Sequence, residues 1–233
     1  MALSLKDVGI VLDKEVRVKI VSRDVPTLDL VDLPGLILTN NRGGPDNISK
    51  LTEICEERYL NAADTTVVLW IVNDTESYLH SVNSIRLVQN CANYDTFKPS
   101  VIGVFAKSDK LSDPNFKDEG HEGPRWVLEQ RLRGAGEDQV HFVNGFVAVK
   151  NRNTRSLNAK NEDLRGCWRN EHDWFQNESA FREDAAANRT VTHELKDQLG
   201  ICALLKKIDK VFCKRLNDHW VPREVRRNHT IIL

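Results

Sequence analysis

The stretch SVIGVFAKSD, residues 100–109, joins an apolar run to a polar ending. Its apolar part is rich in β-branched and aromatic side chains, which predicts a strand over residues 100–105. The polar sequence AKSD follows at once, so Lys107 and Asp109 are expected at the carboxyl end of this strand. Because open parallel sheets bind ligands at the carboxyl ends of their strands, these two residues are the first candidates for a binding loop.

Three further apolar stretches predict strands. Residues 16–33 divide at Val25-Pro26 into two β-branched runs, and the second run ends at Asp32. Residues 67–72, VVLWIV, are apolar on both faces, which fits a strand buried within a parallel sheet. Residues 142–149 form the last predicted strand.

Helical spacing of apolar side chains separates these strands. The spacing predicts helices over residues 47–61, 81–91 and 126–133. Strands that alternate with helices form βαβ units, in which helices cover both faces of a parallel sheet. The chain up to Val149 is therefore expected to be an α/β domain.

No further strand is predicted after Asn151. Residues 156–182 are expected to be mixed helix and loop, with an aromatic group interpreted as a small satellite core: Trp168, Trp174, Phe175 and Phe181. Residues 201–220 predict one amphipathic helix, whose apolar stripe consists of Ile201, Leu204, Leu205, Ile208, Val211, Phe212 and Leu216. A basic cluster within residues 206–227 is interpreted as the solvated face of this helix, with a membrane or partner contact as the alternative.

The composition sets limits on function. The 233 residues are 40% hydrophobic and carry a formal net charge of −1, so a core can be buried and nucleic acid is not expected as a partner. The longest apolar run, residues 67–72, is far shorter than the roughly 20 residues that span a bilayer. Acidic and basic residues are interleaved at the amino end, unlike a signal peptide, so a cytoplasmic location is expected. The five cysteines form no CxxC pair and the seven histidines no HExxH, so no zinc site is predicted.

Three polar motifs follow predicted strands in order along the chain. They are DLPG at Asp32 to Gly35, KSD at Lys107 to Asp109, and Asn151-Arg152 directly after the strand at 142–149. Each motif alone is better explained by an ordinary turn or a solvated loop. Their order and placement, however, resemble the layout of a guanine-nucleotide-binding domain.

The residue types suit two halves of such a site. On the phosphate side, Asp32 can orient Mg²⁺ through water, and the Gly35 N–H can bond a terminal phosphate. On the base side, the Asp109 carboxylate can accept hydrogen bonds from guanine N1–H and its exocyclic amine. The stem of Lys107 can cover the base plane.

Several segments of the sequence carry a more specific resemblance. The stretches VPTLDLVDLPGL, VIGVFAKSD, HFVNGFVAVKNRN and EHDWF together resemble the dynamin family of large GTPases, from about Val16 to Pro222. The resemblance implies an α/β, P-loop-NTPase-like fold, a three-layer and mostly parallel sheet followed by a helical C-terminal segment. In this layout Asn151 and Arg152 close the side of the base opposite Lys107.

The resemblance also implies the domain limits and the function. Residues 1–155 would be a partial GTPase domain, 156–200 a mixed helix and loop part of it, and 201–233 a helix leading toward a helical bundle. The implied activity is binding and hydrolysis of GTP with Mg²⁺, coupled to membrane remodelling or fission. Self-association and an indirect, peripheral association with membranes are implied as well.

The sequence departs from the family at several points. It contains no Gly-Lys pair, so the phosphate loop GxxxxGK[ST] and the first switch are missing, and poor or absent GTP hydrolysis is expected. Ala106 replaces a Thr or Asn of the family, and Tyr78 an acidic residue. Without the phosphate-loop strand, the strands ending at Asp32 and at 67–72 would face a gap with unpaired edges.

Two rival functions remain open from the residues. One is a non-catalytic, dynamin-like scaffold or interaction module, a pseudo-GTPase. The other is an unrelated α/β phosphate-binding domain. No residue is assigned as a catalytic base.

Overall fold

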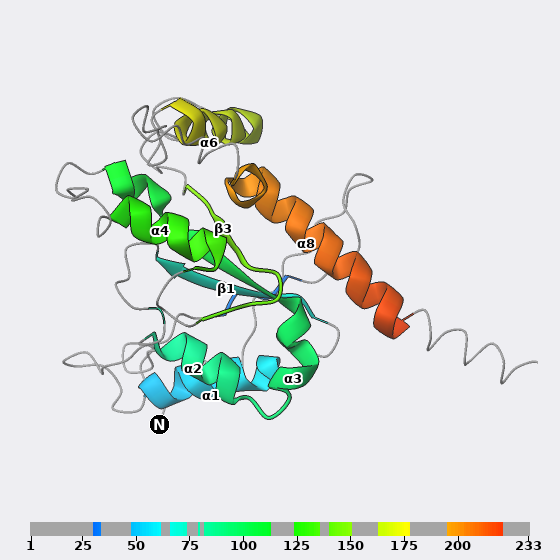
Figure 1. The fold of residues 1–233 in the computed structure, drawn as a ribbon. Helices are drawn as coiled ribbons and strands as arrows, with labels where there is room; N and C mark the ends of the chain where they lie inside the picture. The colour runs from blue at the N-terminus through cyan, green and yellow to red at the C-terminus, as the bar shows by residue number, and fades with distance from the viewer. Residues whose placement is uncertain are drawn as a thin grey trace, which may run out of the picture.

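The computed structural model describes residues 30–33, 48–61, 66–73, 79, 82–112, 124–135, 140–150, 163–177 and 195–220 of the chain. Within these residues, helices lie on both faces of a three-stranded parallel sheet, and a long helix follows near the carboxyl end (Figure 1). The α/β class expected from the sequence is thereby confirmed. The division at residues 155 and 200 stays a prediction.

The sheet has the order β1-β2-β3, with β1 (Val68–Asn73), β2 (Val101–Ala106) and β3 (Phe146–Ala148) all parallel. In its register, Trp70 lies opposite Gly103, which in turn lies opposite Phe146. Since β2 is paired on both sides and buried at every position, it is the central strand of the described sheet. The strands predicted over 67–72 and 100–105 are confirmed.

The last strand is shorter than the sequence predicted. Residues 142–145 form a turn instead, closed by a hydrogen bond of 2.9 Å from the Gly145 N–H to the Phe142 carbonyl. The Asn144 side chain holds this turn against the beginning of β2, because its amide donates to the carbonyls of Pro99 and Val101. The strand predicted from residue 142 therefore begins only at Phe146, because the Asn144 side chain holds residues 142–145 in a turn.

Four helices confirm predicted ranges: α1 (Ile48–Leu60), α2 (Asn83–Asn90), α4 (Pro124–Arg133) and α8 (Ile201–Arg215). The short α3 (Tyr94–Phe97) was not predicted, and α6 (Leu164–Asn177) lies in the stretch expected to be mixed helix and loop. Short helical turns are η3 (Lys98–Ser100), η4 (Ser108–Ser112), η6 (Lys196–Gln198) and the π turn η7 (Leu216–Trp220). Among the described residues, no helix is both long enough and apolar enough to cross a membrane.

One face of the sheet carries the larger core. Side chains from α1, α2, α3, α4 and α6 pack there against Trp70, Phe105 and Phe146. The Phe105 and Phe146 rings stack with their centroids 4.9 Å apart. Trp174 and Phe175 of α6 belong to this main core, so the predicted satellite core is wrong at these two positions.

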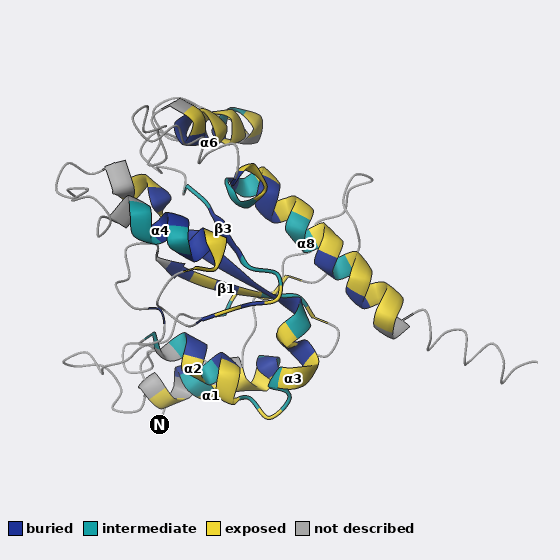
Figure 2. Cartoon of the chain, viewed as in Figure 1, coloured by how far each residue is buried: buried dark blue, intermediate teal, exposed yellow. Residues whose placement is uncertain are grey.

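The opposite face is covered by α8. Ala203, Leu204 and Val211 of this helix pack on sheet residues Ile102, Val104 and Val147. Figure 2 shows the buried residues of α8 along the side that faces the sheet, with exposed residues on the other side. Because alternate residues of a strand point to opposite faces, β2 supplies both cores.

The apolar stripe predicted for α8 is only partly correct. Leu205 is 44% exposed and Leu216 40% exposed, although both were assigned to the buried stripe. The helix packs on the sheet along a narrower line than its apolar residues cover. Similarly, Leu69 and Ile71 of β1 are 37% and 61% exposed, so β1 is not buried on both faces as its sequence predicted.

A half-buried lysine connects α8 to the beginning of β3. The Lys207 ammonium donates to the carbonyls of Asn144 at 2.8 Å and Phe146 at 3.3 Å. Burial lowers the pKa of Lys207, and repulsion from Lys210 lowers it further. The charge of Asp197 partly offsets these two effects. Burying this charge is costly, and its hydrogen bonds to two backbone carbonyls offset part of that cost.

We expect Gly103→Ala to destabilise the chain, because a Cβ at residue 103 would overlap the Phe146 ring across the β2–β3 pairing. The free energy of unfolding should fall by about 1–3 kcal/mol, as in other overpacked cores. Urea denaturation followed by tryptophan fluorescence measures it. Ile71→Thr, on the exposed face of β1, should change it by less than about 0.5 kcal/mol. Equal stabilities of the two variants would contradict the packing described.

We also expect Lys207→Met to cost about 1 kcal/mol of unfolding free energy, because the methionine fills the space of the stem but leaves both carbonyls without this donor. The matched control is Lys206→Met, which alters an exposed neighbour on the same helix and should change stability by less than about 0.5 kcal/mol. Thermal or urea unfolding distinguishes the two variants. A loss of the same size in both would show that the two bonds contribute nothing.

Candidate functional site

The candidate site lies where β2 and β3 end. The Val149 N–H donates to the Phe105 carbonyl at 2.8 Å, and the Ser108 N–H donates to the Val149 carbonyl at 3.2 Å. Backbone pairing therefore continues beyond the last residue of β3. It places the KSD loop directly beside Val149 and Lys150, as expected for the carboxyl ends of neighbouring parallel strands.

A left-handed residue begins the KSD loop. Lys107 has a φ of 63°, which is uncommon for a residue other than glycine and turns the chain sharply out of β2. The Lys110 N–H then bonds the Lys107 carbonyl at 3.0 Å, which starts the short helical turn η4. As a result Lys107 and Asp109 are both exposed at the sheet edge, while Ser108 between them is buried.

Sequence reasoning gave Ser108 no part in the site. The residue is fully buried, and its hydroxyl has no hydrogen-bond partner among the described residues. Its backbone N–H, rather than its side chain, joins the two loops. A serine between two polar residues carries no sequence signal that would reveal this burial.

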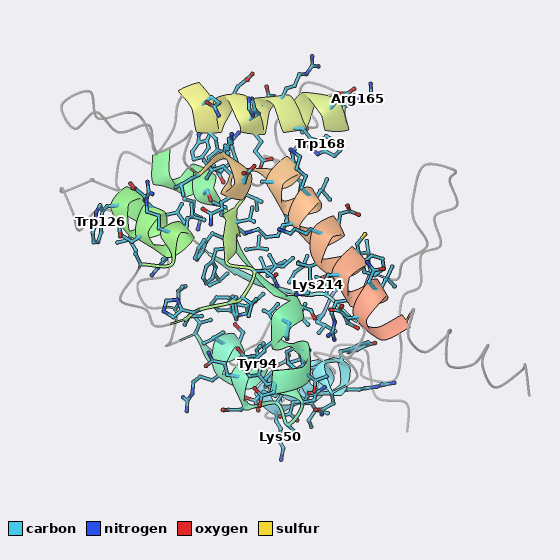
Figure 3. All side chains as sticks on the ribbon, turned by 45° about the vertical axis from the view of Figure 1, so that its right-hand side comes forward. Lys50, Tyr94, Trp126, Arg165, Trp168 and Lys214 are labelled. Atoms are coloured by element: carbon cyan, nitrogen blue, oxygen red, sulfur yellow. The ribbon has the colours of Figure 1, made fainter. Side chains whose placement is uncertain are left out.

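Glu171 of α6 is a second residue whose role the sequence did not reveal. Its carboxylate is buried and accepts one hydrogen bond from the Lys150 N–H at 2.8 Å and another from the Ile201 N–H at 2.7 Å. Burial raises the pKa of Glu171, and the two backbone hydrogen bonds together with the charge of Lys150 counteract this rise. Figure 3 shows α6, which carries the labelled Trp168, beside the amino end of α8.

A sequence signal for Glu171 did exist. On a helix with 3.6 residues per turn, Glu171 shares one side with Cys167, Trp174 and Phe175, and all four are buried. A carboxylate on an apolar helix side must find partners, since an unpaired buried charge is costly. The partners themselves come from segments distant in the sequence, so only the structure identifies them.

Gly200 completes the junction around this carboxylate. Its N–H donates to the Ala148 carbonyl at 2.8 Å, and Leu199 forms a parallel bridge with Ala148. Its φ of 85° and ψ of 166° lie in a region that is essentially restricted to glycine. A side chain at this position would also approach the Glu171 carboxylate oxygen to 3.3 Å.

Of the remaining predicted site residues, only Asp32 lies among the described residues. Asp32 is exposed and lies in no strand, and its neighbours Leu30 and Val31 are 89% and 57% exposed. The prediction that Asp32 ends a buried strand is therefore wrong for residues 30–33, because a strand needs a paired neighbour and apolar contacts. Gly35 and the pair Asn151-Arg152 lie outside the described residues.

A cavity elsewhere in the molecule does not coincide with the candidate loops. It has a volume of about 430 Å³ and lies between α1 and α2. Its lining includes Glu53, Glu57 and Arg86, with none of the residues of the KSD loop. A hollow lined by charged side chains of two helices is a weaker candidate than two segments joined by backbone hydrogen bonds. The ends of β2 and β3 are therefore the better candidate for a binding site.

Comparison with known proteins gives distant relatives. No family model matches the chain. The chain is 23% identical over 167 residues to the interferon-induced GTP-binding protein Mx of Ctenopharyngodon idella, which covers 72% of this chain and 24% of that protein. It is 25% identical over 209 residues to phragmoplastin DRP1A of Arabidopsis thaliana, which covers 86% of this chain and 28% of that protein.

The extent of these matches limits what they show. The chain spans about a quarter of the length of these two curated relatives. The matches nevertheless cover most of this chain. The chain is thus distantly similar over most of its length to two dynamin-family GTPases, which confirms the family resemblance of its motifs.

Proposed function

We propose that the chain binds guanine nucleotides as part of a dynamin-like GTPase, at the carboxyl ends of β2 and β3. The observation that carries the proposal is the Ser108–Val149 backbone hydrogen bond of 3.2 Å. It sets the KSD loop beside the segment that leads into Asn151. Two of the three sequence motifs thereby come from neighbouring strand ends, as a single nucleotide would require.

The base side of the site uses four residues. Asp109 is exposed, so a ligand can reach its carboxylate. The carboxylate can accept hydrogen bonds from guanine N1–H and the exocyclic amine. The left-handed Lys107 is exposed at the sheet edge, where its stem can cover the base. Asn151 and Arg152 follow Lys150 directly and would close the opposite side of the base.

The phosphate side uses Asp32 and Gly35. Asp32 is exposed, which suits a contact to Mg²⁺ through water, and the Gly35 N–H would bond the terminal phosphate. Among the described residues there is no group of three or more His, Cys, Asp or Glu that could hold a metal ion. Mg²⁺ usually keeps several water ligands and is bound through one or two carboxylates plus substrate phosphates, so Asp32 would contact it through water beside the triphosphate.

Hydrolysis and assembly belong to the wider proposal. The name of the Mx relative describes a GTP-binding protein. By the family resemblance, GTP hydrolysis would be coupled to membrane remodelling through self-association. The 233 residues contain no Gly-Lys pair and so no GxxxxGK[ST] loop, which is why the proposal for this chain is base recognition rather than catalysis.

Asp109→Asn tests the base contact. An asparagine side chain offers one donor and one acceptor in place of two acceptors, which matches the O2 and N1–H of xanthine instead of the amine and N1–H of guanine. We expect GDP to bind about 10–100-fold more weakly and XDP to bind more tightly, since a hydrogen bond to a charged group contributes about 1.5–3 kcal/mol. Titration of the chain with fluorescent GDP, competed with XDP and ADP, measures the preference.

The control for this test is Asp95→Asn, which changes an exposed aspartate of α3 before the amino end of β2 and should leave all affinities unchanged. An unchanged preference in the D109N variant would favour an unrelated phosphate-binding domain. Absence of nucleotide binding by the wild-type chain would favour the non-catalytic interaction module.

A further inference from the structure

We infer that Glu171 is a positioning residue for guanine recognition: its carboxylate fixes the backbone at Lys150, directly after Val149, whose carbonyl accepts from the Ser108 N–H of the KSD loop. The inference rests on the proposed function, since it assigns a role in that same site. Glu171 itself touches no nucleotide in this arrangement. It acts through the main chain.

The Glu171 carboxylate bonds two separate segments of the chain at the same time. One carboxylate oxygen accepts from Lys150 at 2.8 Å and the other from Ile201 at 2.7 Å, so both oxygens are used. Glu171 is only 6% exposed, and water therefore competes little for these bonds. The end of β3 is thereby joined to the first turn of α8 through a side chain of α6.

Neighbouring hydrogen bonds make this attachment rigid. The Gly200 N–H bonds the Ala148 carbonyl, two residues before Lys150, and the Val149 N–H bonds the Phe105 carbonyl. Three consecutive residues of the chain, 148 to 150, are thus held by three different elements. Val149, which bonds the KSD loop, is therefore held between two fixed neighbours.

The same short segment holds the KSD loop. The Val149 carbonyl accepts from the Ser108 N–H, between Lys107 and Asp109. Glu171 therefore acts at the point where the KSD loop meets the end of β3. A change that releases Lys150 loosens the segment that holds this loop, and preorganised sites lose affinity when their parts must be ordered on binding.

The chemistry of the side chain predicts which variants fail. Two N–H donors require two acceptors, which a carboxylate provides and a carboxamide does not. In an E171Q variant one backbone N–H would face an NH₂ group, so one of the two bonds is lost without any change in side-chain size. An E171D variant keeps both acceptors on a shorter side chain that cannot span both donors without movement of α6.

The test compares GDP affinity, base preference and local amide exchange in the 233-residue chain. Wild-type, E171Q and E171D proteins are titrated with fluorescent GDP, with ADP as competitor, below the melting temperature of each variant. Hydrogen exchange is measured at Lys150 and Ile201. The matched control is Val88→Ala, which truncates a buried side chain of α2 and lowers stability without touching the junction.

A positioning role predicts a specific pattern. E171Q should weaken GDP by at least about tenfold, reduce the preference for GDP over ADP and accelerate exchange at Lys150, whereas Val88→Ala should leave GDP affinity within about twofold at equal fractions of folded protein. E171D should recover part of the affinity. If E171Q does not fold, the E171D variant decides the question by the same measurements.

Two outcomes would overturn the inference and are distinguishable. If the wild-type chain binds GDP and the Glu171 variants bind it as tightly, or lose affinity no more than Val88→Ala does, Glu171 is only a structural residue and the proposed function stands. If the wild-type chain binds no guanine nucleotide at all, the proposed function fails and the inference with it.

Discussion

The backbone pairing of β2 with β3, continued to Ser108, is the interaction on which the rest of the structure depends. β2 is buried at every position and faces a core on each side, so its neighbours are held by packing as well as by hydrogen bonds. Gly103 permits this pairing because the Phe146 ring occupies the place of a side chain. A parallel pair brings both carboxyl ends to one edge, so the segments that follow β2 and β3 begin side by side.

Polar groups buried near β3 make directional hydrogen bonds, which fix the positions of the helices relative to the sheet in a way that apolar contacts do not. Lys207 bonds carbonyls at the beginning of β3, and Glu171 bonds an N–H just after its end. Apolar contacts are non-directional, so Leu204 and Val211 alone would allow α8 to slide along the sheet. Charged groups with paired partners allow one position only, and each would be costly to leave unpaired.

The positions of helices and strands were largely predictable from the sequence, because local spacing reports which side of an element is apolar. The prediction failed where a distant side chain decides the outcome. Residues 142–145 belong to the stretch predicted as a strand, yet the Asn144 amide donates to the carbonyls of Pro99 and Val101 and holds them in a turn. Leu205 continues the apolar pattern of α8 but remains exposed, whereas its neighbours Ala203 and Leu204 pack on the sheet. Exposure at Leu30 and Val31 likewise depends on pairing that the local sequence does not encode.

The sequence by itself determined the α/β class, the strand ends that carry KSD, and the family resemblance, because these follow from periodicity and from residues close together in the chain. Only the tertiary structure decided that Ser108 is buried, that its N–H joins the loop to Val149, and that Glu171 holds Lys150 and Ile201. Each of these contacts joins residues at least 20 positions apart, and such partners are chosen by how whole elements pack. Hydrogen-bond geometry at a junction is therefore a property of the assembled layers, whereas the pattern that builds each layer is a property of the sequence.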